Sequence, residues 1–127
     1  MPIVQQVTIT VANRPGGLAR VAETLARNRI NITGLNASGA NRRVRLLVSN
    51  PARAVRALKK AKVRARLEPA VAVTLRDRPG SLARAARKLA KRKININYGY
   101  GTVVRGGKRA TIVFGVAKPG RAARLIS

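Results

Sequence analysis

The chain has 127 residues, of which 28 are Lys or Arg and 3 are Asp or Glu, so its formal net charge is +25 at pH 7. The absence of Cys and His excludes disulfide bonds and thiolate metal sites, and it removes the most common general base and metal ligand. The three carboxylates, of Glu23, Glu68 and Asp77, are too scattered to suggest a metal cage or a catalytic pair. We therefore expect no metal site, no cofactor, no catalytic residues and no enzymatic activity.

The rest of the composition is typical of a folded protein. Apolar residues make up 46% of the chain, which is too high for the disordered class. No apolar run approaches the ~18–20 residues of a transmembrane helix, and residues 1–11 show no secretory signal pattern. We expect a globular, cytoplasmic protein that does not bind a membrane.

The chain begins with a predicted strand and helix. Residues 7–11 alternate apolar and polar side chains, as in a half-buried strand. The tripeptide Arg-Pro-Gly at 14–16 ends this strand, because Pro cannot donate to a strand ladder and Gly permits a sharp turn. The spacing then predicts a helix whose apolar face is formed by Leu18, Val21, Ala22, Leu25 and Ala26.

A strand pair, a second helix and a closing strand follow. Residues 30–37 and 44–48 are interpreted as two strands. The pair Asn-Pro at 50–51 predicts the N-cap and first turn of a helix, and residues 63–68 predict a closing strand that ends before Pro69. The buried face of this second helix is expected to contain Val55, Leu58 and Ala61.

The second half of the chain repeats the first. Residues 7–20 align with residues 71–84, and the tripeptide Ile-Asn-Ile at 30–32 aligns with the same tripeptide at 94–96. Both alignments have an offset of 64 residues, so the register survives the intervening helix. The helix predicted in the second copy has its apolar face at Leu82, Ala85, Ala86 and Leu89.

The second copy ends differently from the first. Residues 94–104 and 110–116 predict a strand pair joined by the Gly-Gly turn at 106–107. A short helix is predicted at 119–126, and no closing strand is expected after it. This difference should leave one edge of the second sheet in need of cover or of a partner.

The repeated motif resembles a known family. A βαββαβ unit with both helices on one face of an antiparallel sheet is the ferredoxin-like arrangement. In both copies (Asn/Asp)-Arg-Pro-Gly-(Gly/Ser)-Leu-Ala follows a strand and precedes Ile-Asn-Ile, and this pattern resembles the ACT domain, an amino-acid-sensing module. The chain is similar over its whole length to small stand-alone tandem ACT proteins. We expect an α+β fold of two ferredoxin-like ACT units, residues 1–69 and 70–127, the second without its last strand.

The resemblance implies a ligand site at the turn between the first strand and first helix, at an interface between two such domains. A helix N-terminus offers unpaired N–H groups to a carboxylate, glycine allows close approach, and Asn amides suit both charges of an amino acid. We expect Asn13 and Asn31 to lie at adjacent strand ends, and the first copy is similar to the serine-binding regulatory domain of phosphoglycerate dehydrogenases. The candidate ligand residues are Asn13, Pro15, Gly16, Gly17, Leu18 and Asn31 in the first copy, and Asp77, Gly80, Ser81, Leu82 and Asn95 in the second.

Simpler interpretations of these residues remain open. Gly and Pro are needed at a strand-to-helix turn whether or not a ligand binds there. Asn31 and Asn95 can instead satisfy local backbone groups, and Arg14 and Arg78 can simply be solvated.

The excess of basic residues supports a competing function. The outer helix faces are predicted to carry Arg53, Arg56, Lys59 and Lys60, and then Arg84, Arg87, Lys88, Lys91 and Arg92. Such a surface attracts polyanions, including nucleic acid at low salt, although engineered supercharging gives the same composition. The leading hypothesis is a non-catalytic, homodimeric sensor or regulatory protein that binds a small amino acid. The alternative is a basic accessory protein that binds nucleic acid or another polyanion.

Overall fold

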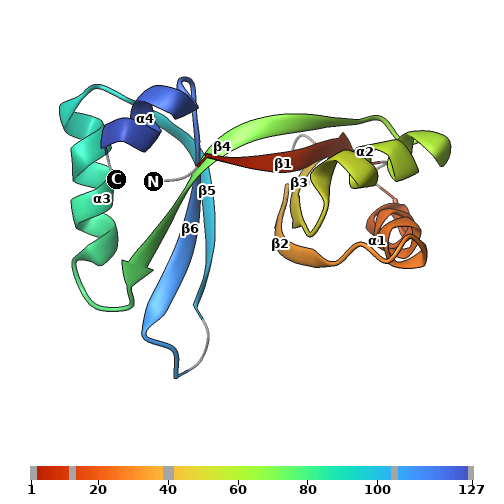
Figure 1. The fold of residues 1–127 in the computed structure, drawn as a ribbon, viewed down its shortest axis with the longest axis horizontal. Helices are drawn as coiled ribbons and strands as arrows, with labels where there is room; N and C mark the ends of the chain where they lie inside the picture. The colour runs from red at the N-terminus through yellow and green to blue at the C-terminus, as the bar shows by residue number, and fades with distance from the viewer. Residues whose placement is uncertain (1–2, 12–13, 39–41, 104–105, 126–127) are drawn as a thin grey trace. The chain divides into compact units, whose positions relative to one another are not determined.

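The computed structural model describes residues 3–11, 14–38, 42–103 and 106–125 (Figure 1). The chain divides into two compact units, one formed by Gln5–Glu68 and the other by Met1–Val4 together with Pro69–Ser127. The elements follow one another as β1 (Ile3–Thr10), α1 (Gly17–Arg27), β2 (Ile32–Ala37), β3 (Arg43–Val48), α2 (Pro51–Lys60), β4 (Ala65–Arg76), α3 (Ser81–Lys91), β5 (Ile96–Val103), β6 (Arg109–Val116) and α4 (Pro119–Leu125).

In the unit Gln5–Glu68 the strands lie in the order β2-β3-β1-β4. The antiparallel register of β1 and β3 places Val7 opposite Leu46 and Ile9 opposite Val44. These side chains are buried against α1 and α2, and the core of the unit consists of Val7, Ile9, Val21, Leu25, Ile30, Val44, Leu46, Ala54, Leu58 and Ala65. The alternation of the strand residues therefore places both helices on one face of the sheet, which is the predicted ferredoxin-like arrangement.

Helix α1 differs from the predicted amphipathic pattern at its ends. Leu18, predicted to be buried, is 38% exposed, while Thr24 is buried and its hydroxyl donates to the carbonyl of Arg20 at 2.8 Å. The prediction for Ala26 was also wrong, since that residue is exposed. Side chains of the first helical turn lean toward the helix N-terminus, so Leu18 extends beyond the core instead of packing onto it.

Helix α2 begins as predicted. The side chain of Asn50 accepts a hydrogen bond from the N–H of Arg53 at 3.2 Å, and Pro51 occupies the first turn. Leu58 is fully buried, whereas Val55 is only half-buried. The small residues Ala54 and Ala57 are buried in its place.

The second unit has the strand order β1-β4-β6-β5, with α3 and α4 along its sheet. β6 is antiparallel to both β4 and β5. Its core comprises Val71, Val73, Leu89, Phe114, Val116 and Ala122. No strand follows α4 within the described residues; the sheet edge beside β4, predicted to lack a strand, is occupied by the start of β1, since Met1–Val4 belongs to this unit.

β4 is a single continuous strand through Pro69, where the sequence predicted an interruption. Pro removes only one N–H donor from the ladder and fixes a φ close to extended values, so one Pro does not by itself end a strand. Both β1 and β4 thus contribute residues to each compact unit. The division into domains 1–69 and 70–127 stays an interpretation of the repeat.

Candidate functional site at the strand-to-helix turns

The first candidate site is the turn that leads into α1. Residues 12–13, including the candidate Asn13, lie outside the described residues. Gly16 is the N-cap of α1 with φ of 89°, a left-handed conformation that favours glycine. The N–H of Gly17 donates to the carbonyl of Arg14 at 3.2 Å, and the N–H of Arg20 donates to the carbonyl of Gly16 at 3.0 Å. The glycine is therefore required by the turn itself.

The turn into α3 has the same geometry. Gly80 has a φ of 90° and is the N-cap of this helix. The N–H of Ser81 donates to the carbonyl of Arg78 at 3.3 Å, and the N–H of Arg84 donates to the carbonyl of Gly80 at 3.0 Å. Each hydrogen bond has its equivalent 64 residues earlier in the chain. The repeated Arg-Pro-Gly motif therefore encodes one local structure twice.

Both helices begin with free backbone donors. Neither helix has an acidic residue in its first turn, and neither N-cap glycine provides a side-chain acceptor. Within the described residues, no backbone acceptor takes the N–H groups of Leu18 and Ala19 in α1 or of Leu82 and Ala83 in α3. The helix dipole and these N–H groups favour an anion at each turn.

A cavity adjoins each turn within its own unit. The cavity beside the first turn has a volume of about 570 Å³, and that beside the second has about 270 Å³. Six pairs of repeat-equivalent residues line both cavities: Thr10 and Thr74, Val11 and Leu75, Arg14 and Arg78, Gly17 and Ser81, Arg20 and Arg84, and Val21 and Ala85. No Asp or Glu from the described part of the chain lines either cavity. The cavities therefore suit an anionic group.

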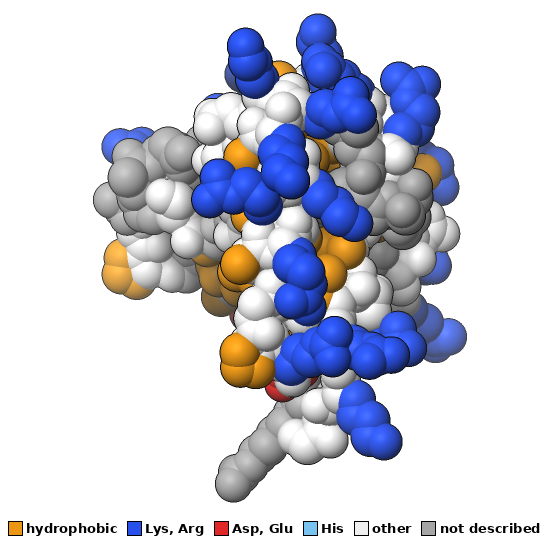
Figure 2. Space-filling model, turned by 90° about the vertical axis from the view of Figure 1, so that its left-hand side faces the viewer, with side chains coloured by type: hydrophobic (Ala, Val, Ile, Leu, Met, Phe, Trp, Pro, Cys, Tyr) orange, Lys and Arg blue, Asp and Glu red, His pale blue; other side chains and the backbone are white. Residues whose placement is uncertain are grey.

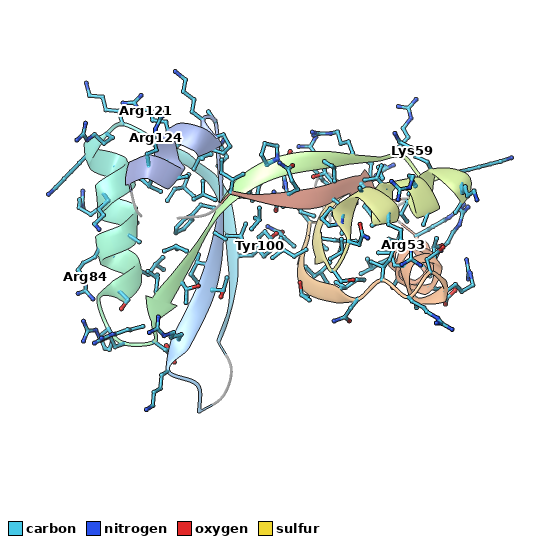
Figure 3. The ribbon with its side chains drawn as sticks, viewed as in Figure 1. Arg53, Lys59, Arg84, Tyr100, Arg121 and Arg124 are labelled. Carbon is cyan, nitrogen blue, oxygen red and sulfur yellow. The ribbon has the colours of Figure 1, made fainter. Side chains whose placement is uncertain are left out.

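The equivalent arginines Arg20 and Arg84 line the two cavities and were not among the predicted site residues. Arg20 donates through Nη2 to the carbonyl of Ala61 at 2.6 Å, which directs it toward the loop after α2. Its equivalent, Arg84, donates through Nη2 to the hydroxyl of Ser81 at 3.4 Å and is labelled on α3 in Figure 3. The sequence signal was present, since both arginines end the aligned segments 7–20 and 71–84.

Asn31 lies far from the turn of its own unit. Its N–H donates to the hydroxyl of Ser49 at 3.0 Å and its carbonyl accepts from the N–H of Ser49 at 2.9 Å. Ser49 directly follows the last residue of β3. Thr10, at the end of β1, is instead opposite Arg43, the first residue of β3. Six residues of strand separate Arg43 from Ser49, or about 20 Å. The expectation that the end of β1 and the start of β2 are adjacent was wrong, because these strands run parallel and are joined by α1, so β1 ends and β2 begins at opposite ends of the sheet.

Asn95 has the equivalent position in the second unit. Asn95 directly precedes Ile96, which is opposite Val116 at the end of β6. The turn before α3 follows Arg76, which is opposite Arg109 at the start of β6. The amide of Asn95 donates to the side-chain oxygen of Asn97 at 3.0 Å. A site that uses both the turn and an asparagine therefore cannot be formed by one unit alone.

The remaining candidates lie at the turns, and all of them except the half-buried Gly17 and the buried Ser81 are exposed. Pro15, Gly16 and Gly17 line the first cavity and Ser81 lines the second. Gly80 is exposed beside it, and Asp77 is exposed and donates its N–H to the carbonyl of Lys108 at 2.9 Å. The equivalent leucines at the start of the two helices, Leu18 and Leu82, are 38% and 52% exposed.

The sequence model of the family described as ACT domain pair matches residues 1–127 of the chain. The chain belongs to the ACT domain pair family. The comparison with curated protein sequences found no match. The family assignment confirms the resemblance inferred from the repeated turn motif.

Solved structures with the ACT-pair fold include protein BT0572 from Bacteroides thetaiotaomicron, which is 26% identical, with a TM-score of 0.88 over 97% of this chain and 85% of that one. The regulatory subunit of aspartate kinase from Thermus thermophilus is 18% identical, with a TM-score of 0.69 over 98% of this chain and 92% of that one. The same subunit from Thermus flavus is 17% identical, with a TM-score of 0.66 over 99% and 95%. At sequence identities this low, the likeness to the two kinase subunits shows a common fold and nothing more.

The basic helix faces are exposed as predicted. Figure 2 shows Lys and Arg side chains gathered on the side of the second unit that carries α3 and α4. The exposed basic residues of α2 and α3 and the ends of these helices are Arg53, Arg56, Lys59, Lys60, Arg84, Arg87, Lys88, Lys91 and Arg92. Among the described residues, no helix is both long and apolar enough to span a membrane.

Proposed function

We propose that the chain is a non-catalytic sensor or regulatory protein that binds a small amino acid at the turns before α1 and α3. The observation that carries the proposal is the repetition of one turn, with its free helix N–H groups and a cavity lined by six equivalent positions, in both units. Membership of the ACT domain pair family supports it, as does a fold shared with proteins named as regulatory subunits.

The ligand carboxylate would be held at the start of each helix. Its contacts are the backbone around Pro15, Gly16 and Gly17 in the first unit, and that around Gly80 and Ser81 in the second. Unpaired N–H groups at a helix start stabilise a carboxylate through hydrogen bonds and the helix dipole. The exposed leucines that begin α1 and α3 would then cover the apolar part of the ligand.

The ligand ammonium group requires oxygen acceptors, which the turn residues Asn13 and Asp77 carry. Asn31 and Asn95 would orient the ligand from a second copy of the chain, because each lies about 20 Å from the turn of its own unit. The proposed site is thus intermolecular, and the protein would act as a homodimer. Ligand binding would favour one arrangement of the two chains over others, and this difference in affinity is the regulatory signal.

Calorimetric titration with each of the twenty amino acids, in about 150 mM salt to screen surface charge, tests the proposal. Asn31→Ala should weaken the amino acid that binds by about tenfold, because one charge-assisted hydrogen bond is lost. Asn36→Ala is the control, since Asn36 is half-buried on β2, the strand that begins directly after Asn31. Failure of all twenty amino acids to bind would refute the proposal.

Mixing two defective chains tests the intermolecular site. Gly16→Val should block the turn, since a β-branched residue resists a φ of 89°, and Asn31→Ala should remove the second contribution. A mixed dimer of the two variants has one site with both contributions intact, so mixing should restore part of the binding. No recovery after subunit exchange would contradict the shared site.

The alternative function is a basic accessory protein that binds nucleic acid. It is supported by the exposed basic residues of α2 and α3, and Figure 2 shows those on the side that carries α3. Binding of this kind depends on counterion release and falls steeply with salt. Tight binding of duplex DNA above about 200 mM salt, combined with no amino acid binding, would favour this function.

A further inference from the structure

A second cavity in the unit Gln5–Glu68 has chemistry that the proposed amino acid site does not use. Its volume is about 580 Å³, within the range of small-molecule sites. It shares part of its wall with the cavity at the first turn but extends along β1 toward β3. Its lining residues are Thr8, Ile9, Thr10, Arg43, Lys59, Lys62, Val63, Arg64, Ala65 and Arg66.

The cavity is lined from both faces of the sheet: Ile9 and Ala65 belong to the core and Lys59 to α2, whereas the polar strand residues face the other way. Thr8 and Thr10 alternate along β1 with the core residues Val7 and Ile9 and therefore lie on the sheet face opposite the helices. Thr10 is directly opposite Arg43 of β3. On β4, Arg66 likewise alternates with the buried residue Ala65 and belongs to the same face as the two threonines.

The cavity carries a large excess of positive charge. Five of its lining residues are Lys or Arg, and no described Asp or Glu lines it. Of these five residues, Arg66 is paired with an acid, since Oε2 of Glu68 is 3.3 Å from its Nη2. Lys59 projects from α2 (Figure 3). It lines this cavity but not the cavity at the first turn. Several cations around one opening strongly favour an anion with more than one charge.

Thr8 provides an independent sign of an absent ligand. The residue is only 4% exposed, and its hydroxyl oxygen is buried without a hydrogen-bond partner among the described residues. Buried hydroxyl groups normally have a partner, because leaving one unpaired is costly. A rotation of about 120° around χ1 exchanges the hydroxyl with the methyl group of similar size, so the residue can present its donor to the cavity it lines.

We propose that this cavity binds a small anion that carries several phosphate groups, of the pyrophosphate or triphosphate class. The hydroxyls of Thr8 and Thr10 donate to phosphate oxygens, and the surrounding Lys and Arg side chains neutralise their charge. Arg is well suited to this role, since its planar group binds phosphate through two parallel hydrogen bonds. The lining contains no aromatic side chain on which a base could stack, which favours the small anion over single-stranded nucleic acid.

Calorimetry with inorganic triphosphate at about 150 mM salt tests the hydroxyl first. Thr8→Val keeps the shape of the side chain and should weaken binding by about tenfold. Thr111→Val, on β6 in the other unit and in neither turn cavity, should leave the affinity unchanged. A folded Thr8→Val protein that binds triphosphate as tightly as the unmodified protein would overturn the role of this residue.

A matched pair of charge variants separates the site from general attraction. Lys59→Gln and Arg87→Gln each remove one exposed cation, but only Lys59 lines the cavity. The first variant should weaken triphosphate binding at least threefold more than the second. Equal losses in the two variants, or displacement of triphosphate by duplex DNA with the same sensitivity to both, would mean that the anion is attracted only by the overall charge.

Discussion

Glu68 holds two arginines and offers a direct test of the energetics in this highly basic chain. Its Oε1 is 2.7 Å from Nε of Arg45, and its Oε2 is 3.3 Å from Nη2 of Arg66. Arg45 is on β3 and Glu68 on β4, so this ion pair spans β1, which lies between those strands. The side chains of Arg45 and Glu68 are 12% and 19% exposed, whereas that of Arg66 is 60% exposed.

The substitution Glu68→Gln should lower the free energy of unfolding by about 2–4 kcal/mol. Removing one partner of a fully buried pair costs about 3–5 kcal/mol, because the other charge is left without compensation. The residual exposure of this pair reduces that figure, and the contact with the solvated Arg66 adds at most about 1 kcal/mol. Repulsion from a net charge of +25 acts in the same direction on Arg45.

Urea unfolding followed by circular dichroism at about 150 mM salt measures this loss. Glu23→Gln is the control, since it removes the same charge from an exposed position on α1 for which the described residues show no ion pair. The control should cost less than about 0.5 kcal/mol. Equal costs for the two variants would refute the reasoning, because the loss would then reflect net charge and not the contacts of Glu68.

Three further substitutions have effects that the same unfolding assay measures. Asn50→Ala should destabilise the protein by about 1 kcal/mol because it removes the N-cap bond to Arg53; a cost near zero would mean that the cap is unimportant. Gly115→Ala places a Cβ directly against the ring of Tyr98, so the ring must move at a cost of about 1–3 kcal/mol; unchanged stability would exclude this close packing. Thr8→Val should leave stability unchanged or raise it by about 1 kcal/mol, because the hydroxyl that it removes has no partner; a loss above about 1 kcal/mol would indicate that the hydroxyl is bonded.

Much of the fold follows from local sequence patterns. The alternation in β1 and the repeat of its turn motif predict two similar units, and the N-cap at Asn50 predicts the start of α2. The continuation of β4 through Pro69 was missed because Pro weakens a strand only at the donor it lacks. The place of Ile3 and Val4 in the second unit depends on residues far away in the sequence, and residues near the chain start carry no local signal for it.

The candidate site was predictable only in its local part. The glycines at 16 and 80 were identified because a left-handed N-cap is a property of a few neighbouring residues. The position of Asn31 depends on the directions in which β1, β2 and β3 run, and the spacing of motifs in the sequence does not give those directions. The unpartnered hydroxyl of Thr8 also depends on burial by residues distant in the sequence, so no pattern within β1 reveals it.

The shared strands have a consequence for how the protein unfolds. A cut beside Pro69 would separate Ile3 and Val4 of β1 from the unit to which they belong, and it would divide β4 itself. Neither unit is thus expected to be stable as an isolated fragment, and heat or urea should unfold both in one transition. A ligand bound at one unit stabilises the native state as a whole. Partial proteolysis of either unit would then become slower when only one of them is occupied.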